Sequence, residues 1–506
     1  MAEAQNIPFG PGALSVIAIY LLSLIGVGWL GLKSRKEATL HEFYLAGRNG
    51  IGFIALLFTL YATQYSGNTL LGFSGRAYRE GYSWTVSVVF MTAIVVCYLL
   101  YAPKLHRLAR KHHFITPTDF LQHRFQCRPL NLLATFIMVA ALGNYFLAQL
   151  TAMGRATQGL TNLPPETAFI TGVILLAAIM VVYETLGGFR AVVWTDVIQG
   201  FVLAVGFLVL IALVFHKFGL PGQSAARLLA DEDTRRLILP PDATACRRWL
   251  SYALIFGLGG ALYPQAIQRI YAARSATSLK KSLAVMAFLP LTTALIAVFT
   301  GVTAAANIPG LEGAEADRIL AVIMKMISGD STFGYWLVVL LFAAILGAMM
   351  STADSALLTT SSMLTKDIYL TCLSPKASQR RLTHVGNVIS WALVVILAAI
   401  AIWLNQAGGK PTLIQLLDMK FDMLLQLSPA FMIGIHWKGM RGMPTFLGMA
   451  AGLALSLSLF SVPSVKAYGV HAGHYGLILN LLISLGGSAF LNRRKSLSTG
   501  ITKTED

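Results

Sequence analysis

The chain has 506 residues, of which 56% are hydrophobic and only 12% are charged. Because a soluble domain carries about a quarter charged residues, this composition excludes an ordinary soluble protein and predicts one that crosses a membrane repeatedly. The formal net charge of +17 alone would suit nucleic-acid binding. The sequence contains no nucleotide-binding glycine loop, specific metal-ligand set or catalytic nucleophile constellation, so we expect neither an enzyme nor a transition-metal protein.

About thirteen apolar stretches are long enough to cross a membrane as helices, which requires about 20 residues each. Their centres lie near residues 22, 61, 92, 143, 174, 206, 259, 291, 349, 393, 424, 451 and 481. Most connections between them are short. The exception is a polar segment at 219–248 on the outer side, and an amphipathic segment at 314–327 is expected at the outer interface. The sequence therefore predicts an all-α polytopic membrane protein with a compact helical bundle.

The basic residues alternate between the two sides of this bundle. If the N-terminus is outside, the inner loops hold 25 of the 39 lysines and arginines, and Arg269 is counted among them. Because basic loops stay on the cytoplasmic side, we predict a multi-pass protein of the cell (inner) membrane with its N-terminus outside and its C-terminus cytoplasmic. The positive charge then reflects topology and contact with the lipid bilayer, and no nucleic-acid partner is expected.

Two of the predicted spans are interrupted by residues that weaken a helix. Residues 60–69 read LYATQYSGNT, and residues 256–265 read FGLGGALYPQ. Breaks at matching positions in two halves are typical of transporter binding sites, because unwound backbone frees carbonyls for a cation and helix N-termini for an anion. The alternative is that the glycines and the proline only loosen or kink packed helices.

Adjacent hydroxyls occur deep in the apolar segment 335–364, at Ser351 and Thr352. Polar groups at that depth need partners because hydrocarbon does not solvate them. A hard cation such as Na⁺ prefers oxygen ligands of this kind. The alternative is that both hydroxyls bond back to carbonyls one helical turn earlier.

Five motifs make the chain resemble the sodium:solute symporter family. They are FYLAGR at 43–48, the Ser66-Gly67 break, GGFRAVVWTDVIQ at 187–199, Gln268-Arg269, and MSTADS at 350–355. The pantothenate and proline branches resemble the chain most. The resemblance implies an inverted five-plus-five helix repeat (LeuT-like) with three extra helices. The implied parts are an N-terminal span and inner loop, a first repeat, an outer loop, a second repeat, two extra spans and a cytoplasmic tail, at 1–49, 50–220, 221–247, 248–437, 438–491 and 492–506 respectively.

The resemblance also implies a single sodium ion between the second and ninth spans, with no organic cofactor. Its ligands would be three backbone carbonyls and two hydroxyls, from Ala62, Tyr65, Ala348, Ser351 and Thr352. Asp196 matches a residue associated with the ion's exit route, and it could also, or only, cap the N-terminus of the sixth span. Gln64 stands where the proline branch has aspartate, so the electrostatic strength of this ion site is reduced.

The solute site is expected around the same two breaks. Tyr145 and Phe256 match positions where proline transporters place substrate-contacting aromatics, with simple packing as the alternative. The full candidate set is Gln64, Ser66, Gly67, Asn68, Tyr145, Phe256 and Gln265. Asn68 replaces an aromatic of the proline branch, which indicates a different pocket. Asp418, Lys420 and Asp422 crowd the eleventh span, either for solute or coupling or as the wall of a water-filled vestibule.

These residues predict a sodium-coupled symporter that imports a small carboxylate-bearing solute by alternating access. Candidates are pantothenate, proline or another amino acid, or a monocarboxylate, because half-helix N-termini suit a carboxylate. The expected partners are this solute, Na⁺ and the bilayer, with no obligatory protein partner. The alternative is a transporter-like membrane sensor domain that responds to such a solute, which the lack of a C-terminal kinase or coiled-coil extension disfavours.

Overall fold

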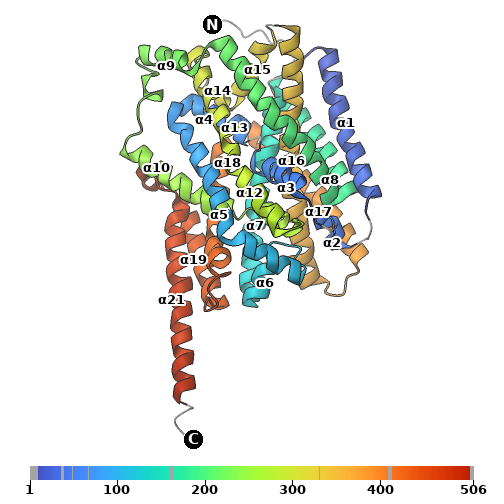
Figure 1. Ribbon diagram of the computed structural model, residues 1–506, viewed down its shortest axis with the longest axis vertical. Coiled ribbons are helices and arrows are strands. Elements are labelled where there is room, and N and C mark those ends of the chain that lie inside the picture. The colour runs from blue at the N-terminus through green and yellow to red at the C-terminus, as the bar shows by residue number, and fades with distance from the viewer. Residues whose placement is uncertain are drawn as a thin grey trace.

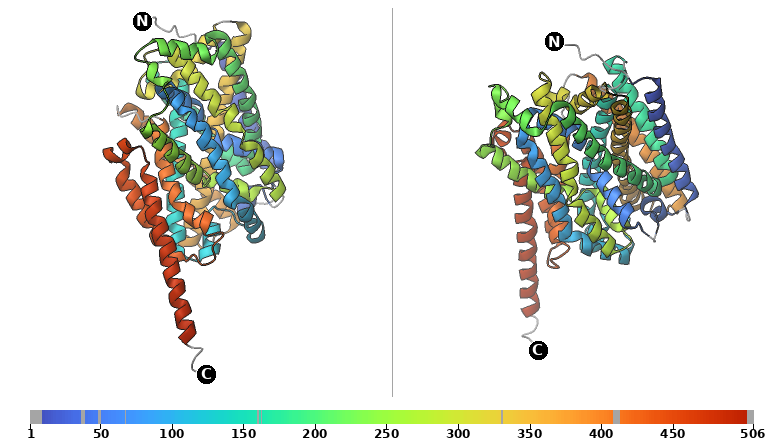
Figure 2. Two further views of the ribbon diagram at one scale, coloured as in Figure 1. Left: turned by 60° about the vertical axis from the view of Figure 1, so that its left-hand side comes forward. Right: turned by 45° about the horizontal axis from the view of Figure 1, so that its top comes forward.

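The computed structural model describes residues 9–35, 39–47, 50–66, 68–158, 161, 163–329, 331–407 and 413–501. Within these residues every regular element is helical, and a lone β-bridge pairs Ile51 with Ala273. The helices form one elongated bundle, and the last of them extends beyond it (Figure 1). Two further views show the same elongated bundle (Figure 2). The expected all-helical fold class is confirmed.

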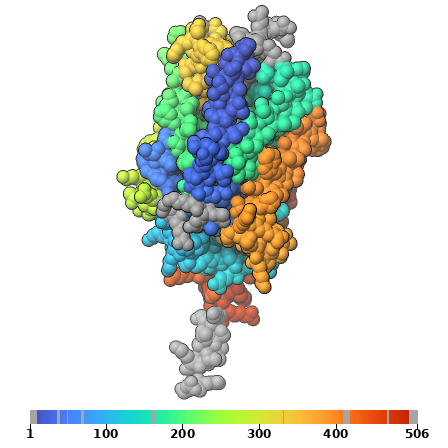
Figure 3. Space-filling model, turned by 90° about the vertical axis from the view of Figure 1, so that its right-hand side faces the viewer, coloured from blue at the N-terminus to red at the C-terminus, as the bar shows by residue number. Residues whose placement is uncertain are grey.

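The first half of the chain contributes eight α-helices to the described structure, together with one short π-helical segment (η1) and one short 3₁₀ segment (η2). Their bounds are α1 Pro11–Lys33, α2 Leu40–Leu45, α3 Phe53–Gln64, η1 Asn68–Gly72, α4 Phe73–Glu80, η2 Gly81–Thr85, α5 Val86–His112, α6 Asp119–Phe125, α7 Arg128–Gln158 and α8 Pro165–Phe218. Helix α1 lies on the outside of the bundle, where it packs against α8 (Figure 3).

The second half continues with many short elements around a few long helices. Their bounds are α9 Pro221–Ala230, η3 Arg235–Leu237, α10 Ala243–Leu254, η4 Ile255–Gly260, α11 Pro264–Ala272, α12 Ala276–Met286, α13 Leu289–Thr292, α14 Ala294–Asn307, η5 Gly313–Arg318, α15 Ile319–Ser328, α16 Thr332–Met363, η6 Leu364–Leu373, α17 Gln379–Gln406, α18 Leu413–Leu424, η7 Leu425–Leu427, η8 Pro429–Ile433, α19 Gly442–Phe460, α20 Pro463–Tyr468 and α21 Ala472–Ile501.

A helical segment covers every one of the thirteen predicted span centres. By length and apolar composition, nine helices of the described residues could each cross a membrane. A tenth candidate is the bent pair formed by 243–260 and 264–272, whose halves meet at 49°. The multi-pass character is therefore clear, whereas the number thirteen stays a prediction.

Helix α8 contains two predicted spans, which meet at a sharp bend. Gly188 adopts φ +59° and ψ −152° there, a conformation open essentially only to glycine. A Cβ atom at Gly188 would lie 2.7 Å from the carbonyl oxygen of Phe43, so the glycine also allows α2 to approach. Asp196 lies past this bend inside the helix and is fully buried. The alternative reading of Asp196 as a helix N-cap is therefore wrong.

Helix α16 runs through the middle of the bundle. Every residue from Leu341 to Met363 is buried, and the helix packs against α3, α7, α8, α11 and α17. By contrast, the peripheral helices α1 and α17 expose apolar side chains such as Ile19 and Val395, which suits contact with lipid. The polar segment of α16 therefore faces only other parts of the protein.

Candidate functional site

The first helix break frees carbonyl oxygens at the end of α3. Tyr65 follows the helix in an extended conformation, with φ −101° and ψ 103°. The backbone N–H of Ser66 then donates to Thr69 Oγ1 at 3.4 Å. Continuing the helix would have directed that N–H to the carbonyl of Ala62. The last carbonyls of α3, beginning with Ala62, are thus available to partners outside the helix.

Thr352 on α16 contacts this open helix end. Its Oγ1 lies 3.0 Å from the carbonyl oxygen of Ala62 and 3.0 Å from that of Ala348, one turn earlier in its own helix. These distances are compatible with both interpretations of the Thr352 hydroxyl, as a sodium ligand and as a donor to the carbonyl one turn earlier. Its single proton can be donated to only one of the two carbonyls at a time. Three of the five predicted sodium ligands converge here, and Tyr65 follows at the same helix end. An all-oxygen set of this kind suits a hard cation.

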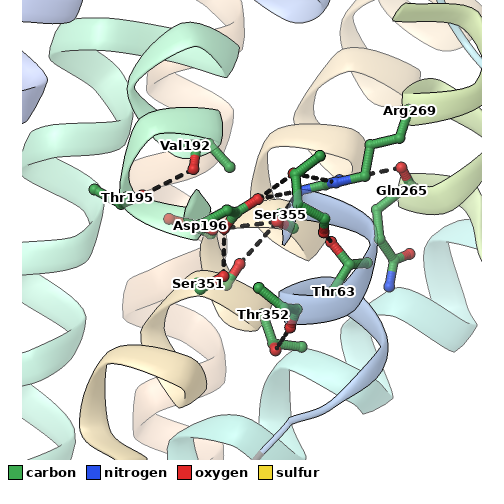
Figure 4. Close-up of polar contacts among 12 residues, drawn as sticks. Thr63, Val192, Thr195, Asp196, Gln265, Arg269, Ser351, Thr352 and Ser355 are labelled. Carbon is green, nitrogen blue, oxygen red and sulfur yellow. Dashed lines mark hydrogen bonds and ion pairs between the residues drawn. The ribbon is translucent and has the colours of Figure 1, made fainter. Parts of the chain in front are cut away.

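Ser351 has a different partner from its neighbour. Its hydroxyl donates to Asp196 Oδ1 on α8, while the hydroxyl of Thr59 on α3 donates to the other carboxylate oxygen (Figure 4). A serine that gives its proton to a carboxylate keeps both lone pairs for a cation. Asp196 therefore lies directly beside a predicted sodium ligand. Its part in an exit route stays a prediction.

Arg269 belongs to this cluster, contrary to its assignment to an inner loop. It lies in α11, is 1% exposed, and places Nη2 2.9 Å from Asp196 Oδ2. The same nitrogen donates to Ser355 at 2.5 Å, and Nε donates to Thr59 at 2.7 Å. The network joins α3, α8, α11 and α16 (Figure 4). The sequence did carry a signal for this buried position. Arg269 directly follows a broken apolar span, and a charge within the membrane needs a buried partner.

The charged groups around the predicted ion ligands are one closed ion pair and a further buried carboxyl group, Asp354, which accepts the hydroxyls of Tyr183 and Ser355. Arg269 offsets the negative charge of Asp196, and Gln64 supplies none. The Gln64 side chain is buried, its Nε2 lies 3.4 Å from the carbonyl of Met91, and its Oε1 has no hydrogen-bond partner among the described residues. The five predicted ligand atoms of a cation here are themselves neutral oxygen dipoles.

The predicted solute residues Tyr145 and Phe256 belong to one aromatic cluster beside both breaks. Tyr145 on α7 donates its hydroxyl to the carbonyl of Thr63 at 3.3 Å, and its ring stacks on Tyr263 at 5.3 Å. The ring centroids of Phe256 on η4 and Phe421 are 4.1 Å apart, and those of Phe421 and Tyr263 are 5.2 Å apart. The cluster thus connects the end of α3 with the second break and α18.

The remaining members of the solute set differ in how well they are defined. Gln265 is fully buried in α11, and neither atom of its amide has a hydrogen-bond partner among the described residues. Ser66 is buried at the first break. Gly67 and the side chain of Asn68 lie outside the described residues. Unpaired amide atoms such as those of Gln265 are costly when buried, which favours a ligand-contacting role.

The acidic and basic residues of α18 separate onto two sides. Asp418 and Asp422 line a cavity of about 560 Å³ together with Arg76, Tyr252 and His471. The vestibule-wall interpretation fits these two aspartates. Lys420 instead places its Nζ 3.2 Å from the centroid of the Tyr145 ring, in the aromatic cluster.

Comparisons with known proteins agree on the class of protein. The profile of the sodium:solute symporter family matches residues 43–452. The sodium/pantothenate symporter of Escherichia coli is 27% identical over 492 residues, covering 94% of this chain and 95% of the relative. The osmoregulated proline transporter OpuE of Bacillus subtilis is 26% identical over 476 residues, covering 93% of each chain. The solved structure of a Na⁺-coupled sialic acid symporter superposes with a TM-score of 0.76 at 18% identity, covering 95% of this chain and 98% of that chain.

Proposed function

Because the chain belongs to the sodium:solute symporter family, we propose that it couples Na⁺ entry to the uptake of a small carboxylate-bearing solute. Pantothenate, proline or another amino acid, and monocarboxylates are the candidate solutes. The observation that carries the proposal is the convergence of Thr352 Oγ1 with the carbonyls of Ala62 and Ala348. It joins the open end of one broken helix to the central helix through oxygen atoms alone.

The geometry suggests how the ion and the solute influence each other. A sodium ion held by Ala62, Tyr65, Ala348, Ser351 and Thr352 would fix the end of α3 against α16. The next carbonyl of α3, at Thr63, accepts the Tyr145 hydroxyl, so an ordered helix end also positions the solute cluster. Coupling then arises because Na⁺ and solute favour the same conformation.

For a solute without net charge, such as zwitterionic proline, the membrane potential supplies much of the driving force in this scheme. Each Na⁺ that moves inward gains about 2.3 kcal/mol per 100 mV. At about 1.4 kcal/mol per factor of ten, that energy would concentrate such a neutral solute roughly fiftyfold. A monoanion such as pantothenate that moves with a single Na⁺ carries no net charge inward, so its uptake depends on the Na⁺ concentration gradient instead. Asp196, which lies beside Ser351, would contribute to the release of the ion towards the inside.

We include the predicted topology, with the N-terminus outside and the C-terminus inside a cell membrane, in this proposal. Its support is that the elements expected on one side gather at one end of the bundle. Helices α9 and α15, from the two predicted outer segments, lie at one end, whereas α6 and the end of α21 lie at the other (Figure 1). The division into repeats at 50–220 and 248–437 is part of the same proposal.

Uptake by the purified protein in proteoliposomes tests the function. Labelled pantothenate, L-proline and L-lactate are offered with an inward Na⁺ gradient, and with an equal K⁺ gradient as the control. Symport predicts accumulation of at least one solute above equilibrium with Na⁺ only. Uptake that is equal with both ions would contradict it. Solute binding seen as thermal stabilisation, but without transport of that solute, would instead support the sensor alternative.

A further inference from the structure

Lys420 is a buried basic residue that forms no ion pair within the described part of the chain. Its side chain on α18 is 0% exposed, and its Nζ has no hydrogen-bond acceptor in the part of the chain that the structure describes. None of the ion pairs among those residues includes it. A buried ammonium group normally requires a partner charge, because its transfer from water is strongly unfavourable. An unpaired lysine at this depth therefore indicates a functional role.

Aromatic rings surround this ammonium group and account for part of its stability. The Nζ atom lies 3.2 Å from the ring centroid of Tyr145, 4.9 Å from that of Tyr263 and 5.1 Å from that of Phe421. The faces of these rings attract a cation. They do not satisfy its three N–H donors, which require oxygen acceptors. The rings hold the charge in position and leave it able to bind an anion.

A second source of positive potential lies next to this lysine. Helix α11 begins at Pro264, directly after Tyr263, and no side chain caps its N-terminus. The N-terminus of a helix carries a partial positive charge and favours anionic groups. Helix α18 also packs against α7, η1 and η4, so Lys420 lies on the element that touches both helix breaks.

We propose that Lys420 binds the carboxylate of the transported solute and thereby selects carboxylates over neutral analogues. This inference rests on the proposed function and identifies the residue behind its substrate class. The carboxylate is bound by the Lys420 ammonium and the N-terminus of α11. The apolar part of the solute packs against the Tyr145 ring, whose hydroxyl contacts Thr63 next to the predicted sodium ligand Ala62.

A continuous series of ring contacts connects Lys420 with the 560 Å³ cavity on the other side of α18. Tyr252 lines that cavity and contacts Phe256 with ring centroids 5.6 Å apart. Phe256 contacts Phe421 at 4.1 Å, and Phe421 lies beside Lys420. A solute entering from the cavity would have to displace these rings to reach Lys420.

The experiment compares matched pairs of solutes that differ only in the carboxylate. The pairs are acetate and acetamide, L-lactate and L-lactamide, L-proline and L-prolinamide, and pantothenate and pantothenyl alcohol. Thermal stabilisation of the full-length protein is measured for each pair in NaCl and in KCl. The variants are Lys420→Met, Lys420→Arg and, as the control, Lys438→Met, which removes a positive charge from an exposed position in the described structure.

For the wild type and Lys438→Met, we expect at least one carboxylate to bind ten times or more tightly than its neutral partner. Lys420→Met should lose this discrimination, and Lys420→Arg should keep part of it. Loss of folding would not mimic the result, because Lys420→Met removes a buried unpaired charge and should leave the solute-free melting temperature unchanged or higher.

Two outcomes overturn the assignment of Lys420. One is a wild type that prefers no carboxylate in any pair, and the other is discrimination that survives unchanged in Lys420→Met. Failure of the proposed function would give a different result from failure of this assignment. The protein would show no sodium-driven uptake, but it could still prefer carboxylates through Lys420.

Discussion

The hydroxyl of Thr352 lies 3.0 Å from the carbonyl oxygen of Ala62, although 290 residues separate them in the chain. The contact exists because α3 stops at the first break and leaves the Ala62 carbonyl without its helical N–H partner. A sodium ion bound between these oxygens, with the hydroxyl proton turned away from the Ala62 carbonyl, would join the same two helices. The predicted coupling between ion and solute begins at this contact.

Removal of either central hydroxyl should weaken sodium binding. We expect Thr352→Ala and Ser351→Ala to raise the sodium concentration for half-maximal uptake tenfold or more, because each variant deletes one of five predicted oxygen ligands. The matched control is Thr360→Ala on the same helix, whose hydroxyl only bonds back to the Ala356 carbonyl at 2.8 Å. Sodium dependence that is unchanged in both ligand variants, measured as uptake against Na⁺ concentration, would refute the site.

The free energy of unfolding should fall more when one member of the buried Asp196–Arg269 pair is removed than when both are removed. Asp196→Asn or Arg269→Gln alone leaves an uncompensated charge, and we expect each to lower the free energy of unfolding by about 3–5 kcal/mol. The double variant should recover part of this loss, because neither charge remains. A double-mutant cycle from denaturation in detergent measures the coupling. Strictly additive effects would show that the pair does not act as a unit.

Restoring a carboxylate at Gln64 should strengthen the ion site. Because Arg269 is already paired with Asp196, the added charge of Gln64→Asp is expected to act mainly on a cation bound at the end of α3. We expect the half-saturating sodium concentration to fall by roughly fivefold, which corresponds to about 1 kcal/mol. Gln64→Asn, which shortens the side chain without adding charge, is the control. If Gln64→Asp shows the same sodium affinity as Gln64→Asn, a negative charge at this position does not stabilise the bound ion.

Two native cysteines report the topology. Cys246 and Cys372 are both exposed, and the proposed topology puts the first outside the cell and the second inside. Variants that retain one cysteine each are treated on intact cells with a membrane-impermeant maleimide. We expect labelling of Cys246 in intact cells and of Cys372 only after permeabilisation. The reverse pattern would invert the proposed orientation.

Much of this protein could be predicted from local features of its sequence. A helical segment lies at the centre of every predicted apolar stretch. The glycine- and proline-containing interruptions correctly predicted both breaks, near Tyr65 and at 255–263. These predictions succeed because helix formation in a membrane depends on the residues of each span, which must satisfy their own backbone. The adjacent hydroxyls of Ser351 and Thr352 were visible for the same reason.

The partners of buried groups were decided only by the tertiary structure. Ser351 and Thr352 look alike in sequence, yet one donates to Asp196 and the other contacts Ala62. The sequence placed Arg269 on an inner loop and left Lys420 between a solute or coupling role and a vestibule wall. The fold instead pairs Arg269 with a carboxylate and surrounds Lys420 with rings. Sequence pattern identifies which segments are buried, but the field at a buried charge depends on side chains from helices hundreds of residues apart, which only packing brings together.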